Sequence, residues 1–108
     1  MLVLLVEHFL TAEGRARFPA WVREIEEAAS RFPGFVDIRQ MTRLDAPERC
    51  FFMLMFASPE HAESWIDSPQ RQALLARMGP YRLKEQEGTR WIAGDAWATA
   101  GATASDDV

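Results

Sequence analysis

The chain is poor in the residues that build disulfide frameworks, metal centres and nucleic-acid-binding surfaces. Its 108 residues include one cysteine, Cys50, one lysine, Lys84, and two histidines, His8 and His61. A single cysteine cannot form an internal disulfide, and no CxxC, HxxxH or HExxH spacing occurs, so we expect no metal. The net charge of −4 and the lack of a Lys/Arg cluster argue against nucleic acid and anionic membranes as partners.

Long apolar runs are also lacking. The apolar start MLVLLV has no basic segment before it, so we expect no signal peptide, and no stretch approaches the ~20 residues of a membrane span. A glycine-rich phosphate loop and a GxSxG serine are absent, which argues against nucleotide binding and serine nucleophiles. The composition predicts one globular domain in a reducing cytoplasm.

Hydrophobic periodicity gives the order of the secondary structure. Apolar residues at Phe18, Trp21, Val22, Ile25 and Ala29 form one stripe of a helix. Serine followed by proline, at residues 58–59 and 68–69, is typical of two helix starts, with serine as the N-cap. We predict strands near Leu2–Phe9, Phe35–Leu44, Cys50–Ala57 and Thr89–Trp97, a hairpin loop at Asp45–Glu48, and helices near Gly14–Phe32, Pro59–Asp67 and Pro69–Met78. Pro19 predicts a helix start close to Arg15 or a kink.

The order β-α-β-β-α-β predicts an α+β, ferredoxin-like domain with a four-stranded antiparallel sheet over residues 1–97. The first and third strands, apolar on both faces, should lie in its centre, and Phe35–Leu44 should be an edge strand. The two helical segments of this order, the second of them formed by two short helices, cover only one face of such a sheet. We therefore expect a homodimer in which a second copy covers the other face. Residues 98–108 have no periodicity and should be a disordered tail.

Candidate functional residues are aromatic, with one acid. Trp21, Trp65 and Trp91 can face the space between helices and sheet, although core filling is the favoured explanation of Trp21 and Trp91. Trp65 lies on a short helix and is a candidate pocket wall. Glu7 is the one acid in an apolar strand. It either reaches water or an arginine near the strand end, or it faces the helices with Val3, Leu5 and Phe9 and borders one pocket with Trp65, where its pKa would rise.

The strings RFPGFVDI, CFFMLMFAS and FASPEHAESWIDSPQRQALL resemble the antibiotic biosynthesis monooxygenase family. The resemblance covers about Leu2 to Trp97 and implies a dimeric α/β barrel of ferredoxin-like subunits. It also implies oxygenation of a quinol or phenol without a cofactor, with Trp65 at the position of the family's pocket tryptophan. The family's haem degraders pair that tryptophan with an asparagine and a histidine. Glu7 and Leu75 stand at those positions here, so haem degradation is disfavoured.

We therefore expect a cofactor-independent monooxygenase acting on a small aromatic substrate. Its expected catalytic residues are Glu7 as the base, Trp65, and Arg71 as a charge stabiliser; the roles of Glu7 and Arg71 are inferred from position alone. The expected substrate pocket comprises Phe9, Trp21, Leu75, Tyr81 and Trp91. The alternative is a dimer on the same scaffold that binds a small ligand or a partner without catalysis.

Overall fold

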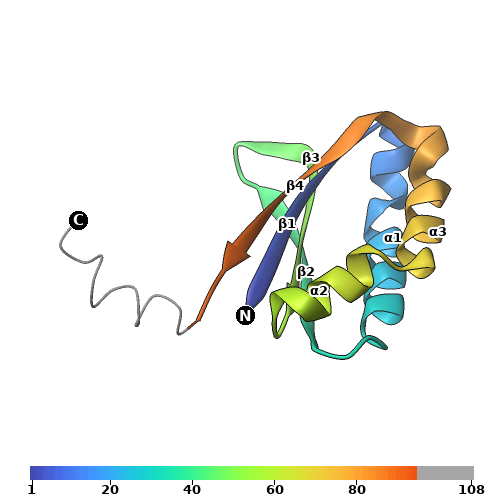
Figure 1. The fold of residues 1–108 in the computed structure, drawn as a ribbon. Coiled ribbons are helices and arrows are strands. Elements are labelled where there is room, and N and C mark those ends of the chain that lie inside the picture. Colours follow the sequence, from blue (N-terminus) through green and yellow to red (C-terminus); the bar gives the residue numbers. More distant parts are fainter. Residues whose placement is uncertain (95–108) are drawn as a thin grey trace.

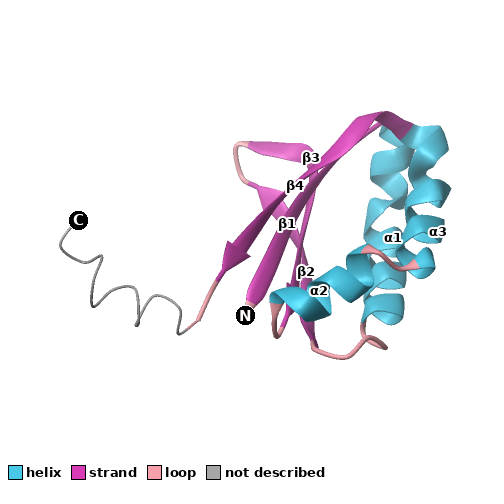
Figure 2. Ribbon diagram, in the orientation of Figure 1, coloured by secondary structure: helices cyan, strands magenta, loops and turns pink. Residues whose placement is uncertain are grey.

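The computed structural model describes residues 1–94, in which three helices lie on one face of a four-stranded antiparallel sheet (Figures 1 and 2). The predicted ferredoxin-like α+β fold is confirmed. The elements in chain order are β1 (Leu2–Leu10), α1 (Ala12–Ala29), β2 (Phe35–Arg43), β3 (Ala46–Phe56), α2 (Pro59–Ile66), α3 (Pro69–Met78), a 3-10 turn η1 (Gly79–Tyr81) and β4 (Arg82–Ile92).

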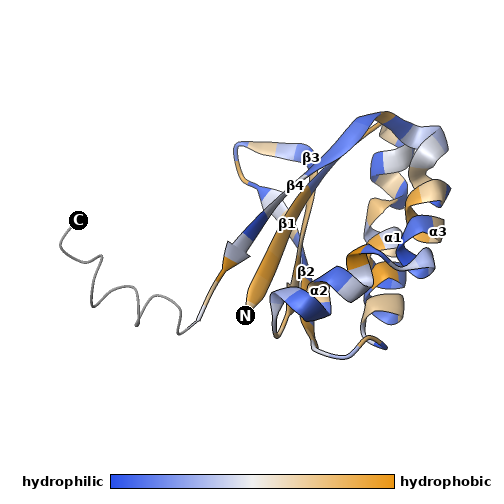
Figure 3. Ribbon diagram, in the orientation of Figure 1, coloured by the Kyte–Doolittle hydropathy of each residue, from blue (hydrophilic) through white to orange (hydrophobic). Residues whose placement is uncertain are grey.

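The sheet order β2-β3-β1-β4 places the two most apolar strands in the centre, as predicted. Leu4 of β1 lies opposite Leu54 of β3 on one side and Arg90 of β4 on the other. Figure 3 shows most of β1 in the hydrophobic colour. The alternating strand β2 lies at the edge, where polar side chains on one face can remain in water.

The helix starts follow from the serine and threonine caps. Thr11, Ser58 and Ser68 each accept a hydrogen bond from a backbone N–H three residues later, and Pro59 and Pro69 occupy first helical positions, which need no N–H. The helix α1 begins at Ala12, earlier than Pro19 had suggested, and Pro19 lies inside it. The Thr11 cap accounts for this earlier start.

A glycine is required where β2 enters the sheet beside α2. Gly34 has a φ of +82°, which L side chains rarely adopt, and a Cβ there would lie 2.2 Å from the Cγ of His61. Gly34 therefore permits both the turn that follows α1 and the close approach of α2.

Two predicted boundaries were wrong. The last strand begins at Arg82, well before Thr89, because the stretch from Arg82 to Gly88, polar as it is, pairs with β1 along the sheet edge. The hairpin turn is also shorter than predicted: β3 already begins at Ala46, which pairs with Arg43. The predicted strand end at Trp97 and the predicted tail at 98–108 lie outside the described residues.

The face of β1 that meets the helices was also predicted wrongly. The even-numbered residues face α1: Leu2, Leu4 and Leu10 belong to the core, and the ring of His8 lies 4.8 Å from that of Trp21. The stripe predicted for α1 is buried as expected. From β3, the core receives Cys50, Phe52, Leu54 and Phe56. Odd-numbered β1 residues, Glu7 among them, face the other side of the sheet.

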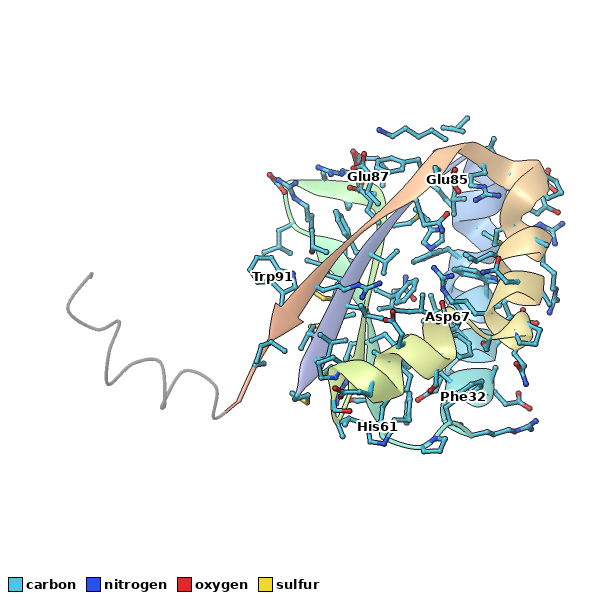
Figure 4. The ribbon with its side chains drawn as sticks, viewed as in Figure 1. Phe32, His61, Asp67, Glu85, Glu87 and Trp91 are labelled. Atoms are coloured by element: carbon cyan, nitrogen blue, oxygen red, sulfur yellow. The ribbon has the colours of Figure 1, made fainter. Side chains whose placement is uncertain are left out.

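That other side, the helix-free face, is rich in large apolar side chains. It carries Val3 and Leu5 from β1, Phe51, Met53 and Met55 from β3, and Trp91 from β4. Trp91 is 56 % exposed and lies on the side of β4 that points away from the helices (Figure 4). No helix within residues 1–94 covers this face (Figure 2). Nor is any described helix long and apolar enough to cross a membrane.

Candidate functional site

A cavity of about 220 Å³ lies between the sheet and the helices. Each strand except the edge strand β2 contributes to its lining, and so does each helix. The lining residues are Leu4, Val6 and His8 of β1, Trp21 and Ile25 of α1, Phe52 and Leu54 of β3, Trp65 and Ile66 of α2, Arg71, Leu74 and Leu75 of α3, and Gln86, Gly88, Thr89 and Arg90 of β4.

The cavity has a buried aromatic end and an exposed polar side. His8, Trp21 and Phe52 are almost fully buried, whereas Thr89 and Arg90 of β4 are exposed. An apolar cavity with few polar groups is typical of a small-molecule site. A ligand would enter beside β4 and reach toward His8.

His8 is the most unusual group in this cavity. It is 3 % exposed and surrounded by the rings of Phe18, Trp21 and Phe52 at centroid distances of 4.8 to 5.9 Å. Neither ring nitrogen has a hydrogen-bond partner among residues 1–94. Burial, with smaller contributions from Arg82 and Arg71, lowers the pKa of His8 to about 4. The imidazole is therefore neutral near pH 7 and offers one acceptor and one donor.

The two buried tryptophans that line the cavity differ in how they are fixed. The Trp21 indole N–H donates to the carbonyl oxygen of Leu74 at 2.8 Å, which ties α1 to α3. Trp65 is 2 % exposed and packs edge-on against Phe32, at a centroid distance of 5.3 Å. Trp65 can therefore fill the core and also form a wall of the pocket, because one part of its ring packs against Phe32 while another borders the cavity.

Arg71 brings a positive charge to the cavity. The Arg71 Nη1 donates to the Ile66 carbonyl oxygen at 3.1 Å, and no carboxylate of residues 1–94 lies within 4.0 Å of its guanidinium nitrogens. Desolvation, and then Arg90, lower its pKa. A guanidinium stays charged in proteins, so Arg71 is a cation with bonding capacity to spare. Leu75, on the same helix, also lines the cavity.

Glu7 lies on the opposite face of the sheet from this cavity. Its two carboxylate oxygens each accept a hydrogen bond from Arg49, both at 2.6 Å. These bonds lower its pKa, against the opposing effect of burial. The predicted pocket shared by Glu7 and Trp65 is therefore wrong. The other expectation for Glu7, that it reaches an arginine, agrees with its bonds to Arg49.

Three other predicted pocket residues also lie elsewhere. Phe9 lies beneath the ammonium group of Lys84, 4.2 Å from the ring centroid, on the helix-free face. Trp91 is on that face too. Tyr81 is half-buried, packs against Gly14 at the start of α1, and lies under the guanidinium of Arg17. None of the three lines the cavity, whereas Trp21, Trp65, Arg71 and Leu75 do.

His8 was missed as a site residue because it was weighed only as a metal ligand. Its position in the strand was a usable signal. Leu4, Val6 and His8 share one face of β1, opposite to the face that carries Glu7. The described residues include no group of three or more side chains placed to hold a metal ion. Cys50 is buried, and desolvation raises the pKa of its thiol, as expected for a packed cysteine.

Comparison with known proteins finds relatives in structure alone. No protein-family model matches the chain, and no curated protein matches its sequence. Solved structures do match: a candidate antibiotic biosynthesis monooxygenase of Deinococcus radiodurans superposes with a TM-score of 0.77 at 14 % identity, over 89 % of this chain and 95 % of that one. One of Nitrosomonas europaea gives 0.74 at 15 % identity, over 86 % and 98 %.

A third similar structure is SnoaB of Streptomyces nogalater, a cofactor-independent oxygenase. It superposes with a TM-score of 0.69 at 15 % identity, over 86 % of this chain and 92 % of that one. At this level of identity the likeness shows the fold alone. The chain thus has the fold of the antibiotic biosynthesis monooxygenases, as the sequence resemblance had indicated.

Proposed function

We propose that this chain, which has the fold of the antibiotic biosynthesis monooxygenases, is a cofactor-independent monooxygenase of a phenol- or quinol-like aromatic substrate. The observation that carries the proposal is the buried, neutral imidazole of His8, which lines an apolar cavity and has no hydrogen-bond partner among residues 1–94. A buried polar group without a partner costs free energy of about 1–3 kcal/mol. A ligand hydroxyl that bonds to His8 removes this cost; because protein atoms cover both ring nitrogens, the imidazole or a neighbouring side chain must shift to admit it.

The size of the cavity restricts the substrate. An apolar cavity of about 150 Å³ accepts benzene, and pockets for drug-sized ligands begin at about 300 Å³. The 220 Å³ here falls between these volumes. We therefore favour an aromatic of one or two rings over the larger polycyclic phenols.

The proposed reaction uses the substrate's own electrons. His8 accepts the phenolic proton, and the electron-rich anion then reacts with O₂. For a simple phenol, one oxygen atom becomes a new ring carbonyl, and the other leaves as water with the hydroxyl hydrogen and one ring hydrogen, giving a quinone. The imidazolium formed in the step is stabilised by the phenolate beside it. The low pKa of His8 in the protein alone therefore does not apply to the complex. The apolar walls exclude water from the anion.

Trp65 and Arg71 have supporting roles in the proposal. Trp65 supplies a flat aromatic wall for the substrate ring. Arg71 supplies a positive potential that favours an anionic ligand. Glu7 has no part in the reaction, because its carboxylate bonds to Arg49 on the other face of the sheet.

We also propose that the protein is a homodimer through the helix-free face. This face combines the exposed Trp91 with the partly exposed side chains of Leu5, Phe51, Met53 and Met55. Apolar area of this kind seldom remains in water, and a second copy is its simplest cover. Two such sheets packed face to face would give a dimeric α/β barrel. A single buried thiol suits a cytoplasmic location.

Oxygen uptake with a panel of one-, two- and three-ring phenols and quinols tests the proposed function. We expect one O₂ consumed per substrate for the one- and two-ring compounds, with one atom of ¹⁸O₂ found in the product. The reaction should need no added metal or flavin. Tight binding of the same compounds without oxygen uptake would contradict catalysis and leave the second candidate, a ligand-binding dimer.

A further inference from the structure

We infer that the ligand of this cavity carries a carboxylate as well as its hydroxyl, which makes it a hydroxyaryl acid of one or two rings. This inference deepens the proposed function, and it rests on that function only in taking the cavity as the ligand-binding site. The hydroxyl would bond to His8 at the buried end. The carboxylate would bond to Arg71 nearer the surface.

The first argument is the unbalanced charge of Arg71. Other arginines near Arg71 form ion pairs: Arg90, which also lines the cavity, with Glu63, Arg82 with Glu85, and Arg77 of the same helix with Glu24. Arg71 is half-buried and lines the cavity, and within residues 1–94 its guanidinium has only the neutral carbonyl of Ile66 as a hydrogen-bond partner. A partly desolvated guanidinium is a planar fork of donors that fits a carboxylate with two parallel hydrogen bonds.

The second argument is a neighbouring hollow that shares Arg71 with the cavity. It is lined by Arg71, Gln72, Leu75, Ala76, Arg82, Glu85 and Gln86. The hollow and the cavity have Arg71, Leu75 and Gln86 in common. Arg71 therefore stands between a dry aromatic site and a polar one. A flat ligand in the cavity that extends past Arg71 would place its substituent in this polar hollow.

The charges around the hollow indicate a single negative charge on the ligand. Arg82 lies 3.5 Å from Glu85, which offsets its charge, and it donates to the side chain of the neutral Gln86 at 3.0 Å. Asp67 also acts on Arg71, but from beyond ion-pair distance. The charged residues that line the hollow, Arg71, Arg82 and Glu85, therefore leave one net positive charge. A monoanionic carboxylate balances it, whereas a phosphate dianion would face Glu85 with excess negative charge.

Binding of 6-hydroxy-2-naphthoate and of its neutral methyl ester, measured under nitrogen by quenching of tryptophan fluorescence, tests the inference. The two probes share the ring and the hydroxyl and differ in charge. We expect the acid to bind at least tenfold more tightly than the ester. Arg71→Met should abolish this preference, and Arg71→Lys, which keeps the charge, should retain part of it.

Arg77→Met is the matched control, because Arg77 lies on the same helix but lines neither the cavity nor the hollow. It should keep the full preference for the acid. Equal binding of acid and ester by the unmodified protein would overturn the inference, even if Arg71→Met fails to fold. A strong preference for the acid without oxygen uptake would leave the inference intact and contradict only the proposed catalysis.

Discussion

The carboxylate of Glu7 and the guanidinium of Arg49 form two parallel hydrogen bonds of 2.6 Å across strands β1 and β3. Glu7 lies opposite Phe51 in the register, so Arg49, two residues earlier, is on the same face. The guanidinium also lies 5.2 Å from the centroid of the Phe51 ring. The one acid of the central strand is therefore a structural group of the helix-free face.

We predict that Glu7→Gln lowers the melting temperature but leaves ligand binding in the cavity unchanged. The amide cannot replace both charge-assisted bonds to Arg49. Because the pKa of Glu7 is lowered in the fold, the stability it contributes is present above pH 4.5 and declines as the pH falls below it. Glu87→Gln, on the neighbouring exposed strand, is the control and should change the melting temperature little. A large loss of ligand affinity in Glu7→Gln would contradict this assignment.

His8 should make the protein less stable in mild acid. Its pKa is about 4 in the fold and 6.5 in the unfolded chain, so the unfolded chain alone takes up the proton between these values. From pH 7 to pH 5 we expect His8 to lower the free energy of unfolding by about 2 kcal/mol. Denaturant titrations at both pH values should show that His8→Phe removes this loss. An unchanged pH dependence in His8→Phe would show that His8 is not buried as described.

Trp65→Ala should be strongly destabilised, by about 3–5 kcal/mol, because Trp65 is 2 % exposed and packs against Phe32. The alanine variant alone therefore cannot test its role as a pocket wall. Trp65→Leu preserves apolar packing without the flat ring, and should reduce aromatic ligand affinity more than it reduces thermal stability. If Trp65→Leu bound aromatic ligands with the same affinity as the unmodified protein, the proposed role of Trp65 as a pocket wall would be contradicted.

Met53→Glu should give a monomer. Met53 lies opposite Leu5 on the helix-free face, where a second copy would bury a new charge without a partner. Light scattering should give twice the chain mass of 12.3 kDa for the unmodified protein and the single mass for the variant. Ala20→Glu, on the exposed side of α1, is the control and should stay dimeric. A 12.3 kDa particle for the unmodified protein at micromolar concentration would exclude the dimer.

The fold could be predicted because its signals are local. The stripe of α1 and the caps at Ser58 and Ser68 depend on nearby residues, and the two apolar strands correctly indicated the centre of the sheet. The start of β4 could not be predicted in this way. The stretch from Arg82 to Gly88 is polar, and it becomes a strand only because it pairs with β1.

The site was harder to predict because β1 is apolar on both faces. Periodicity alone cannot say whether Glu7 or His8 faces the helices, because adjacent strand residues point to opposite faces and both faces of β1 are apolar. The answer depends on the register, which brings Arg49 to Glu7. With the acid paired there, His8 is left facing Trp21 and the cavity.

Oxygen consumption by a matched pair of variants, His8→Phe and Glu7→Gln, tests the central claim most directly. These neighbours on β1 face opposite sides of the sheet, and only His8 lines the cavity. With a two-ring hydroxyaryl substrate accepted by the unmodified protein, we predict that His8→Phe slows oxygen uptake by about 100-fold or more, the usual contribution of a general base, and that Glu7→Gln leaves it within about threefold. Loss of uptake in Glu7→Gln with normal uptake in His8→Phe would contradict the account.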